Sequence, residues 1–231
     1  MTPKIEKLEW DSDFFEIRVG QLNSDALVFC AHDLAEFDLL IDKSELDRTL
    51  EIDGFTNTFG ECKLTFSKSI KKRNFSNKTP ILDSDLHPIT AEKLYTLAFE
   101  SGKHSRFKLD KGFSNDKFEA LYKKWIRNSI NKTFASKIFY TEKNGEAMSF
   151  VTIKQFHDYA EFGLFAISSK HQGQGLGQQL MDYVEAYCAT QNLKSIRIPT
   201  QKSNIPATNI YIKNGYTIHE QLFIKHYWKN K

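Results

Sequence analysis

The chain has 231 residues, of which 40% are hydrophobic and 13% aromatic, so it can bury a sizeable core as one large domain or two small ones. Its net charge of +3, from 32 basic and 29 acidic residues, is too balanced to favour binding to nucleic acid or to an anionic membrane. Three widely spaced cysteines, no secretory leader and no apolar run near 18 residues lead us to expect a cytoplasmic protein without a transmembrane segment.

Residues 1–75 are expected to form a small N-terminal α/β domain. Phe37–Ile41 is apolar enough for a strand, and Ser44 is suited to cap a short helix through Ile52 that Gly54 ends. Apolar residues alternate with polar ones over residues 62–66, as in a half-buried strand. The result is a strand–helix–strand layer without clustered titratable groups, so we predict a structural role.

A linker or an exposed strand end is predicted over residues 68–78, where the apolar periodicity stops. At its centre the run Lys71-Lys72-Arg73 is most typical of a solvated face, with attraction of a nucleotide as the alternative. The aromatic stretch Trp10–Phe15 is more typical of packing than of chemistry.

The remaining residues, 79–231, show a clear order of elements. We predict a strand near Ile81, a helix over 87–99 with Pro88 in its first turn, a polar loop over 101–114, and an amphipathic helix over 118–129. Asn144-Gly145 predicts a hairpin between strands 138–142 and 148–157. Strand 160–167 then leads through a Gly-rich turn to a helix ending at Thr190, a strand over 194–200, a short helix and a last strand.

The Gly-rich turn, Gln172-Gly173-Gln174-Gly175-Leu176-Gly177, is the feature around which the chain is organised. A strand-to-helix turn exposes backbone N–H groups at the positive end of a helix, and glycines let an anion approach them. Gly177 is not followed by the Lys-Ser/Thr of a P-loop, and the turn comes too late in the chain for a dinucleotide fold. The turn therefore predicts a pyrophosphate site.

Two motifs resemble those of the GNAT N-acetyltransferases. Gln172, Gly175 and Gly177 match the family pattern Gln/Arg-x-x-Gly-x-Gly/Ala, and Asn204 to Tyr216 is similar to its second motif, Asn-x-x-Ala-x-x-x-Tyr-x-x-x-Gly-Phe/Tyr. The resemblance implies the GNAT fold over residues 79–231, an α/β class with a central mixed, twisted sheet flanked by helices. It also implies acetyl-CoA as co-substrate.

Within that family the chain looks like the group that acetylates the 4-amino group of dTDP-4-amino-4,6-dideoxyhexoses. The residues that carry this resemblance lie outside the two general motifs: Trp10, Phe14-Phe15, Ser105-Arg106-Phe107, Asp110, Phe118, Tyr122, Trp125-Ile126 and Asn128-Ser129. For these positions the resemblance implies a nucleotide-sugar substrate bound near Ser105, Arg106, Phe107 and Asp110. Arg106 is suited to a diphosphate, and an ion pair with Asp110 is an equally good interpretation.

Acetyl transfer needs a held donor, an acid for the leaving thiolate and a neutral amine. Backbone amides of Phe165, Ala166 and Ile167 are expected to bind pantetheine and polarise the thioester, because this strand should splay from its neighbour. Gln178 could add an amide at the pyrophosphate, and the family resemblance implies that Asn204 contacts coenzyme A.

Tyr211 is the predicted acid, because a phenol is protonated at neutral pH, with packing of the short helix as the alternative. Glu161 matches the general-base position of related histone acetyltransferases, but it could equally be a solvated strand residue or be replaced by water. Two other functions stay open: acetylation of a peptide, polyamine or aminoglycoside, and a non-catalytic coenzyme A-binding module. We expect no metal site, because the seven histidines lack ligand spacing, and the chain could form a homodimer.

Overall fold

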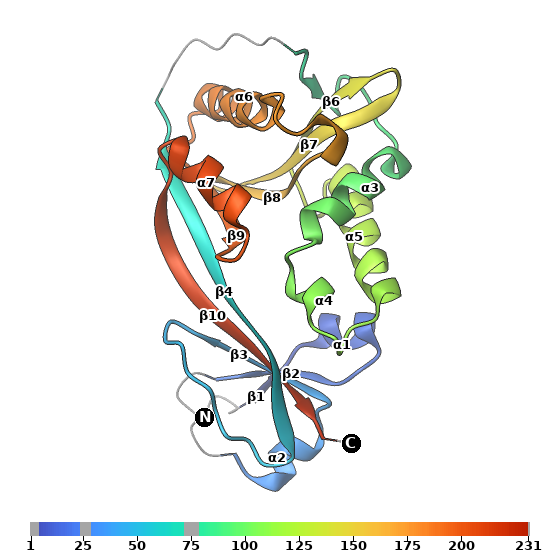
Figure 1. The fold of residues 1–231 in the computed structure, drawn as a ribbon, viewed down its shortest axis with the longest axis vertical. Coiled ribbons are helices and arrows are strands. Elements are labelled where there is room, and N and C mark those ends of the chain that lie inside the picture. Colours follow the sequence, from blue (N-terminus) through green and yellow to red (C-terminus); the bar gives the residue numbers. More distant parts are fainter. Residues whose placement is uncertain (1–4, 24–28, 72–78, 231) are drawn as a thin grey trace.

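The computed structural model describes residues 5–23, 29–71 and 79–230, and within them the chain forms a mixed α/β structure (Figure 1). In chain order the elements are β1 (Ile5–Lys7), α1 (Glu9–Phe15), β2 (Val19–Leu22), α2 (Ala31–Ala35), β3 (Leu39–Ser44), β4 (Phe55–Ser69), β5 (Leu82–Asp83), α3 (Ala91–Gly102), α4 (Arg106–Leu109), α5 (Asn115–Ile130), β6 (Lys137–Lys143), β7 (Glu146–Gln155), β8 (Tyr159–Ile167), the 3₁₀ turn η1 (Ser169–His171), α6 (Leu176–Thr190), β9 (Ser195–Gln201), α7 (Ile205–Lys213) and β10 (Thr217–Lys229).

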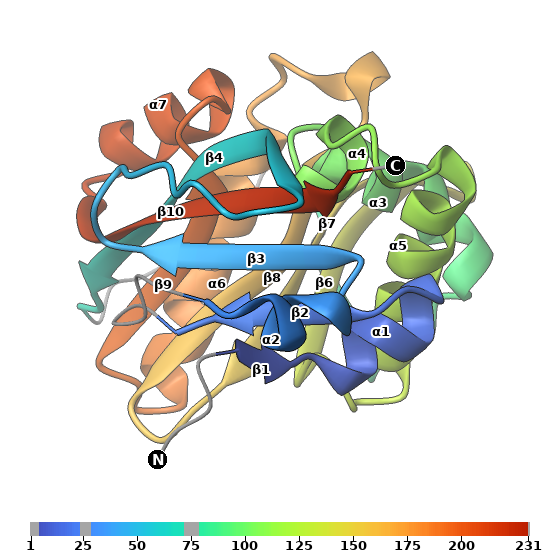
Figure 2. The ribbon, with the colours of Figure 1, turned by 90° about the horizontal axis from the view of Figure 1, so that it is seen from below.

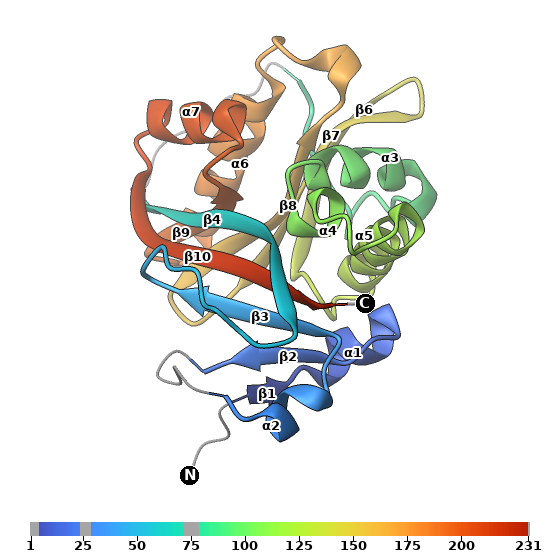
Figure 3. The same ribbon diagram turned by 60° about the horizontal axis from the view of Figure 1, so that its bottom comes forward.

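The strands of these three ranges form one ten-stranded sheet in the order β1-β2-β3-β10-β4-β9-β8-β7-β6-β5. Neighbouring strands are antiparallel except for the pairs β2–β3 and β8–β9. The long strands β4 and β10 lie side by side and connect the N-terminal strands to the rest of the sheet (Figures 2 and 3). The predicted α/β class with a central mixed sheet is confirmed.

Helices cover both faces of the sheet. Leu94 of α3 and Leu121 of α5 pack with Phe150 of β7 in one buried cluster. Leu180 of α6 packs with Ile196 of β9 in a second cluster on the other side. Figure 1 shows the two helical layers, with α6 and α7 on one side and α3 to α5 on the other. None of the helices in the described part of the chain is long and apolar enough to span a membrane.

The predicted helix from Ser44 to Ile52 is wrong. This segment is irregular, because tertiary contacts replace the helical hydrogen bonds. The Arg48 guanidinium pairs with the Asp42 carboxylate at 2.9 Å, and the Leu50 N–H donates to the Tyr227 hydroxyl at 2.9 Å. The predicted strand–helix–strand layer is therefore wrong too, and β10 lies between β3 and β4.

Other predicted elements need smaller corrections. The first helix of the second region begins at Ala91 rather than at residue 87, with Thr90 as its N-cap, so Pro88 precedes the helix and is not in its first turn. The His87 N–H instead closes a turn onto the Asp83 carbonyl. The predicted loop 101–114 contains the short helix α4. The predicted hairpin is confirmed, with both Asn144 and Gly145 at positive φ.

Strands from both predicted units belong to one continuous sheet. β4 ends at Ser69 and pairs with β10 on one side and β9 on the other. Most of the basic run Lys71-Lys72-Arg73 lies outside the described residues. The independence of residues 1–75 as a domain stays a prediction.

Candidate active site

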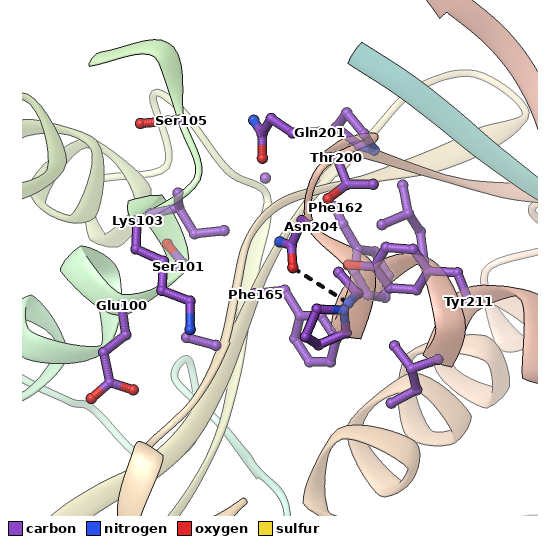
Figure 4. Close-up of a pocket in the computed structure, with 18 of the residues that line it drawn as sticks. Glu100, Ser101, Lys103, Ser105, Phe162, Phe165, Thr200, Gln201, Asn204 and Tyr211 are labelled. Atoms are coloured by element: carbon purple, nitrogen blue, oxygen red, sulfur yellow. Dashed lines mark hydrogen bonds between the residues drawn. The ribbon is translucent and has the colours of Figure 1, made fainter. Parts of the chain in front are cut away.

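A cavity of about 940 Å³ lies between two walls of the structure. One wall comes from α3, α4 and α5, and the other from β8, β9 and α7. In Figure 4, Ser105, Lys103 and Glu100 lie on the first side, and Asn204, Phe165 and Tyr211 lie on the second. All predicted site residues line this cavity except Gln174 and Asp110.

The second wall opens because β8 and β9 separate. They pair where Tyr159 to Glu161 meet Ser195 to Arg197. From Phe162 onward β8 has no strand partner on that edge among the described residues. A bulge in the β7–β8 ladder lies at Gly163, where a Cβ atom would come within 2.6 Å of the Thr152 Oγ1. The sequence-based expectation of a splayed strand is thus met, and the backbone of Phe165–Ile167 lines the opening.

The Gly-rich turn sits at the outer end of this opening. Gly173 and Gly175 have φ angles of 76° and 79°, which only glycine adopts at little cost, and Gly175 immediately precedes α6. The first-turn N–H groups of α6 have no helical acceptor, so they are available to an anion. The Gln178 side chain is already held by the Asn214 side chain, so only its backbone amide is free to serve there.

Lys103 and Lys213 also line the cavity, and sequence reasoning missed both. They come from the C-terminal ends of α3 and α7, helices that the sequence did predict. Nothing in the local pattern distinguishes them from the many other exposed lysines of the chain.

Tyr211 and Asn204 belong to α7. Asn204 caps this helix, and its Oδ1 accepts from the Ala207 N–H at 3.4 Å. The Tyr211 ring is buried against Phe66, which agrees with a packing role, while its side chain also lines the cavity. Burial raises the pKa of the Tyr211 phenol above its usual value, so the hydroxyl is a proton donor throughout the physiological pH range.

Glu161 is half-buried and lines the cavity at the closed end of the β8–β9 opening. Its neighbours in the strand register are Lys154 on β7 and Arg197 on β9. A carboxylate with cationic neighbours on both sides can also be explained as part of a charged sheet face.

Ser105, Arg106 and Phe107 start the short helix α4 and line the cavity together. The Arg106 guanidinium lies 4.7 Å from the centre of the Phe107 ring, and its Nε is buried without a hydrogen-bond partner in the described ranges. Trp125 of α5 packs edge-on against Phe107, which extends an aromatic wall along this part of the cavity.

Asp110 does not form the alternative ion pair with Arg106. Its carboxylate is buried and binds the His226 Nδ1 at 2.6 Å and the Trp228 Nε1 at 2.9 Å, and it accepts the Gly112 N–H at 2.9 Å. Burial lowers the pKa of His226, so this ring is neutral. We therefore assign Asp110 to anchoring α4 on β10 and not to the substrate site.

Three charged residues that sequence reasoning missed, Lys43, Glu61 and Lys63, also line the cavity. They come from β3 and β4, within the segment predicted to be structural. Their sequence signal is weak, because charged residues alternating with apolar ones in a strand usually face solvent. The pairing of β4 with β9 brings Glu61 and Lys63 next to the site, and β10, which lies between β3 and β4, adds Lys43.

Together these features define a class of protein. A free strand edge beside an anion-binding helix N-terminus and a buried phenol is suited to acyl transfer from a thioester that carries phosphate groups. The profile of the acetyltransferase (GNAT) family matches residues 93–216, and the chain belongs to this family. It is accordingly an acetyl-CoA-dependent N-acetyltransferase.

Two curated relatives are linked by their names to sugars. The chain is 24% identical to the dTDP-fucosamine acetyltransferase of Escherichia coli O6:H1 over 223 residues, covering 93% of each chain. It is 25% identical over 144 residues to the spore coat polysaccharide biosynthesis protein SpsD of Bacillus subtilis, a match that covers 62% of this chain and only 50% of SpsD.

Solved structures share the fold at low sequence identity. A conserved Staphylococcus epidermidis protein of unknown function has a TM-score of 0.60 at 12% identity, with coverage of 86% of this chain and 76% of that one. A GNAT-family acetyltransferase from Novosphingobium aromaticivorans has a TM-score of 0.55, also at 12% identity, with coverage of 84% and 75%. The predicted GNAT fold is confirmed.

Proposed function

We propose that the enzyme transfers the acetyl group of acetyl-CoA to the 4-amino group of a dTDP-4-amino-4,6-dideoxyhexose. The observation that carries this proposal is the likeness to dTDP-fucosamine acetyltransferase, which extends over 93% of both chains and so includes the acceptor side of the cavity. A likeness confined to the acetyl-CoA motifs would say nothing about the acceptor.

The charges of the acceptor side support a nucleotide diphosphate. Lys43, Lys63 and Arg106 line this part of the cavity, and Arg106 has a buried nitrogen without a partner in the described ranges. A guanidinium binds phosphate oxygens in a fixed fork, and the lysines add point charges. The neighbouring aromatic rings of Phe107 and Trp125 suit a sugar or a thymine base.

The donor side supports direct attack on the thioester. Here the amides of Phe165–Ile167 would hold the pantetheine arm and polarise the carbonyl group, and the turn from Gln172 to Gly177 would bind the pyrophosphate. Asn204 would contact the coenzyme, and Tyr211 would protonate the thiolate as it leaves. Glu161 stays a candidate for the base.

Two further properties belong to the proposal. A nucleotide sugar and acetyl-CoA are both cytoplasmic metabolites, which supports a cytoplasmic location. A homodimer also stays a prediction, which sedimentation at several protein concentrations can test.

The test follows free thiol release from acetyl-CoA with separate acceptors: dTDP-4-amino-4,6-dideoxygalactose, its glucose epimer, the UDP analogue and a polyamine. We expect rapid turnover with a dTDP-amino sugar and little with the polyamine. If only the polyamine were acetylated, or if none of the amines were, the nucleotide-sugar proposal would be refuted and the family assignment would stay intact.

A further inference from the structure

Glu61 stands in a row of side chains that crosses three strands on the acceptor side of the cavity. On β4 it lies opposite Ile224 of β10, and Ile224 lies opposite Lys43 of β3. Directly opposed residues project to the same face of a sheet, and all three line the cavity. The sheet register therefore fixes the position of the Glu61 carboxylate.

One oxygen of this carboxylate has no partner. The Glu61 Oε2 is buried and accepts no hydrogen bond from the residues that the structure describes. The neighbouring Lys43 ammonium donates to the Gln21 Oε1 at 2.6 Å instead. Because an unpaired buried oxygen is costly, the arrangement favours a ligand that supplies a donor there.

Charged and titratable groups surround Glu61 from every element packed against it. Burial raises the pKa of the Glu61 carboxyl from its usual 4.5 to about 7, against the opposing effect of Arg106 and Lys63. A group with this pKa can both accept and release a proton near neutral pH. The groups that interact electrostatically with Glu61 are Cys62 and Lys63 of β4, Arg106 of α4 and Tyr122 of α5. Lys43 of β3 and the neutral His226 of β10 project to the same face of the sheet.

An amine acceptor arrives mostly as the ammonium ion, which cannot attack a carbonyl carbon. We propose that Glu61 binds this ammonium group and takes one of its protons before the acetyl group is transferred. The inference rests on the proposed function in one respect, because it requires an amine acceptor in this cavity. It does not require that the acceptor be a nucleotide sugar.

The protons balance as follows. The first ammonium proton passes to the Glu61 carboxylate and later to solvent. The neutral nitrogen then forms a bond to the acetyl carbonyl carbon, and the C–S bond breaks. The Tyr211 phenol gives its proton to the leaving sulfur, and the phenol recovers a proton from the nitrogen. The products are the amide, free coenzyme A thiol and one proton.

Glu161 is the competing base, and the structure separates the two carboxylates. Glu161 lies where β8 is still paired with β9, between the cationic neighbours Lys154 and Arg197 in the register. Glu61 has cationic neighbours too, Lys63 and Arg106, but its Oε2 and the Arg106 Nε are both buried without a partner in the described ranges. Glu61 and Arg106 line the same cavity, and these two buried atoms favour Glu61 as the residue that touches the acceptor.

The experiment compares kcat/KM for the amine between pH 5.5 and 9.5 in the wild type, Glu61→Gln, Glu61→Asp and Glu161→Gln. The acceptor is whichever amine of the panel above gives thiol release. Glu146→Gln, at the exposed hairpin, is the matched control for loss of a carboxylate. Titration calorimetry with acetyl-CoA shows that each variant is folded and has its donor site intact.

We expect Glu61→Gln to lower kcat/KM by ~10²-fold at pH 7 and by less than ~10-fold at pH 9.5, where a much larger fraction of the amine is already neutral in solution. The change of kcat/KM with pH near pH 7 should disappear in Glu61→Gln. It should persist in Glu161→Gln, and in Glu61→Asp it should persist at a shifted pH. A loss of equal size at every pH would mean a structural role and would overturn the inference, as would an unchanged rate.

The outcomes also separate this inference from the proposed function. Glu61-dependent turnover of the polyamine alone would refute the nucleotide-sugar proposal and support the role of Glu61. If Glu61→Gln acetylated the dTDP-amino sugar at the wild-type rate, the nucleotide-sugar proposal would be supported and the role of Glu61 refuted. If none of the amines in the panel supported thiol release, both proposals would be refuted.

Discussion

Glu61→Gln should make the protein more stable at alkaline pH, although it removes a residue of the site. In the folded chain burial raises the pKa of this carboxyl from 4.5 to about 7. Between these values the folded state holds a proton that the unfolded state has lost, so the folded protein loses stability as the pH rises. The cost is absent well below pH 4.5 and is complete above pH 7.

The size of the effect follows from the shift. Each unit is worth about 1.4 kcal/mol, so the full cost is about 3 kcal/mol, of which about 2 to 3 kcal/mol develops between pH 5 and pH 8.5. Glutamine has nearly the same shape and cannot ionise. The free energy of unfolding of Glu61→Gln, minus that of the wild type, should therefore increase by this amount across the range.

Urea unfolding followed by tryptophan fluorescence at pH 5, 6, 7 and 8.5 measures this difference. Any packing change caused by the substitution is the same at each pH and cancels. Glu146→Gln controls for removal of an exposed carboxylate, which should change stability little. A difference between Glu61→Gln and the wild type that stays constant with pH would refute the reasoning, because the carboxyl would then be ionised at little cost.

Three further predictions concern the acid, the strand opening and the support of α4. Tyr211→Phe should lower kcat by ~10²-fold or more at pH 7 and leave the Kd of acetyl-CoA within about twofold, measured by thiol release and calorimetry; an unchanged kcat would leave Tyr211 with packing alone. Gly163→Ala puts a Cβ atom 2.6 Å from the Thr152 Oγ1, so it should cost about 1–3 kcal/mol in urea unfolding and raise the KM for acetyl-CoA. Combining it with Thr152→Ala should recover part of the loss, and no recovery would contradict a clash with this side chain. Asp110→Ala removes the buried partner of His226 and should cost about 1–3 kcal/mol without altering the Kd of acetyl-CoA, whereas a changed Kd at unchanged stability would contradict an anchoring role.

The donor half of the site could be predicted from the sequence because its parts are local. The turn from Gln172 to Gly177 and the helix after it are consecutive in the chain, and glycine permits the positive φ angles that the turn needs. Tyr211 follows Asn204 by two helical turns, so one short helix carries both residues to the cavity. The hairpin at Asn144-Gly145 was predictable for the same reason.

The errors lie where distant segments decide the local structure. Ser44 is followed by residues that suit a short helix, but Arg48 and Leu50 are held by Asp42 and Tyr227 instead. A helix of about nine residues gains too little from its own hydrogen bonds to resist such contacts.

The sequence by itself determined the class, the fold and the Gly-rich turn, because each follows from neighbouring residues and known motifs. Only the tertiary structure decided the acceptor half. There Glu61 becomes a cavity residue because β4 pairs with β9, and Lys43 joins it because the last strand, β10, lies between β3 and β4 and aligns Ile224 with both residues. The register between strands more than 150 residues apart depends on the whole sheet, and no local pattern encodes it.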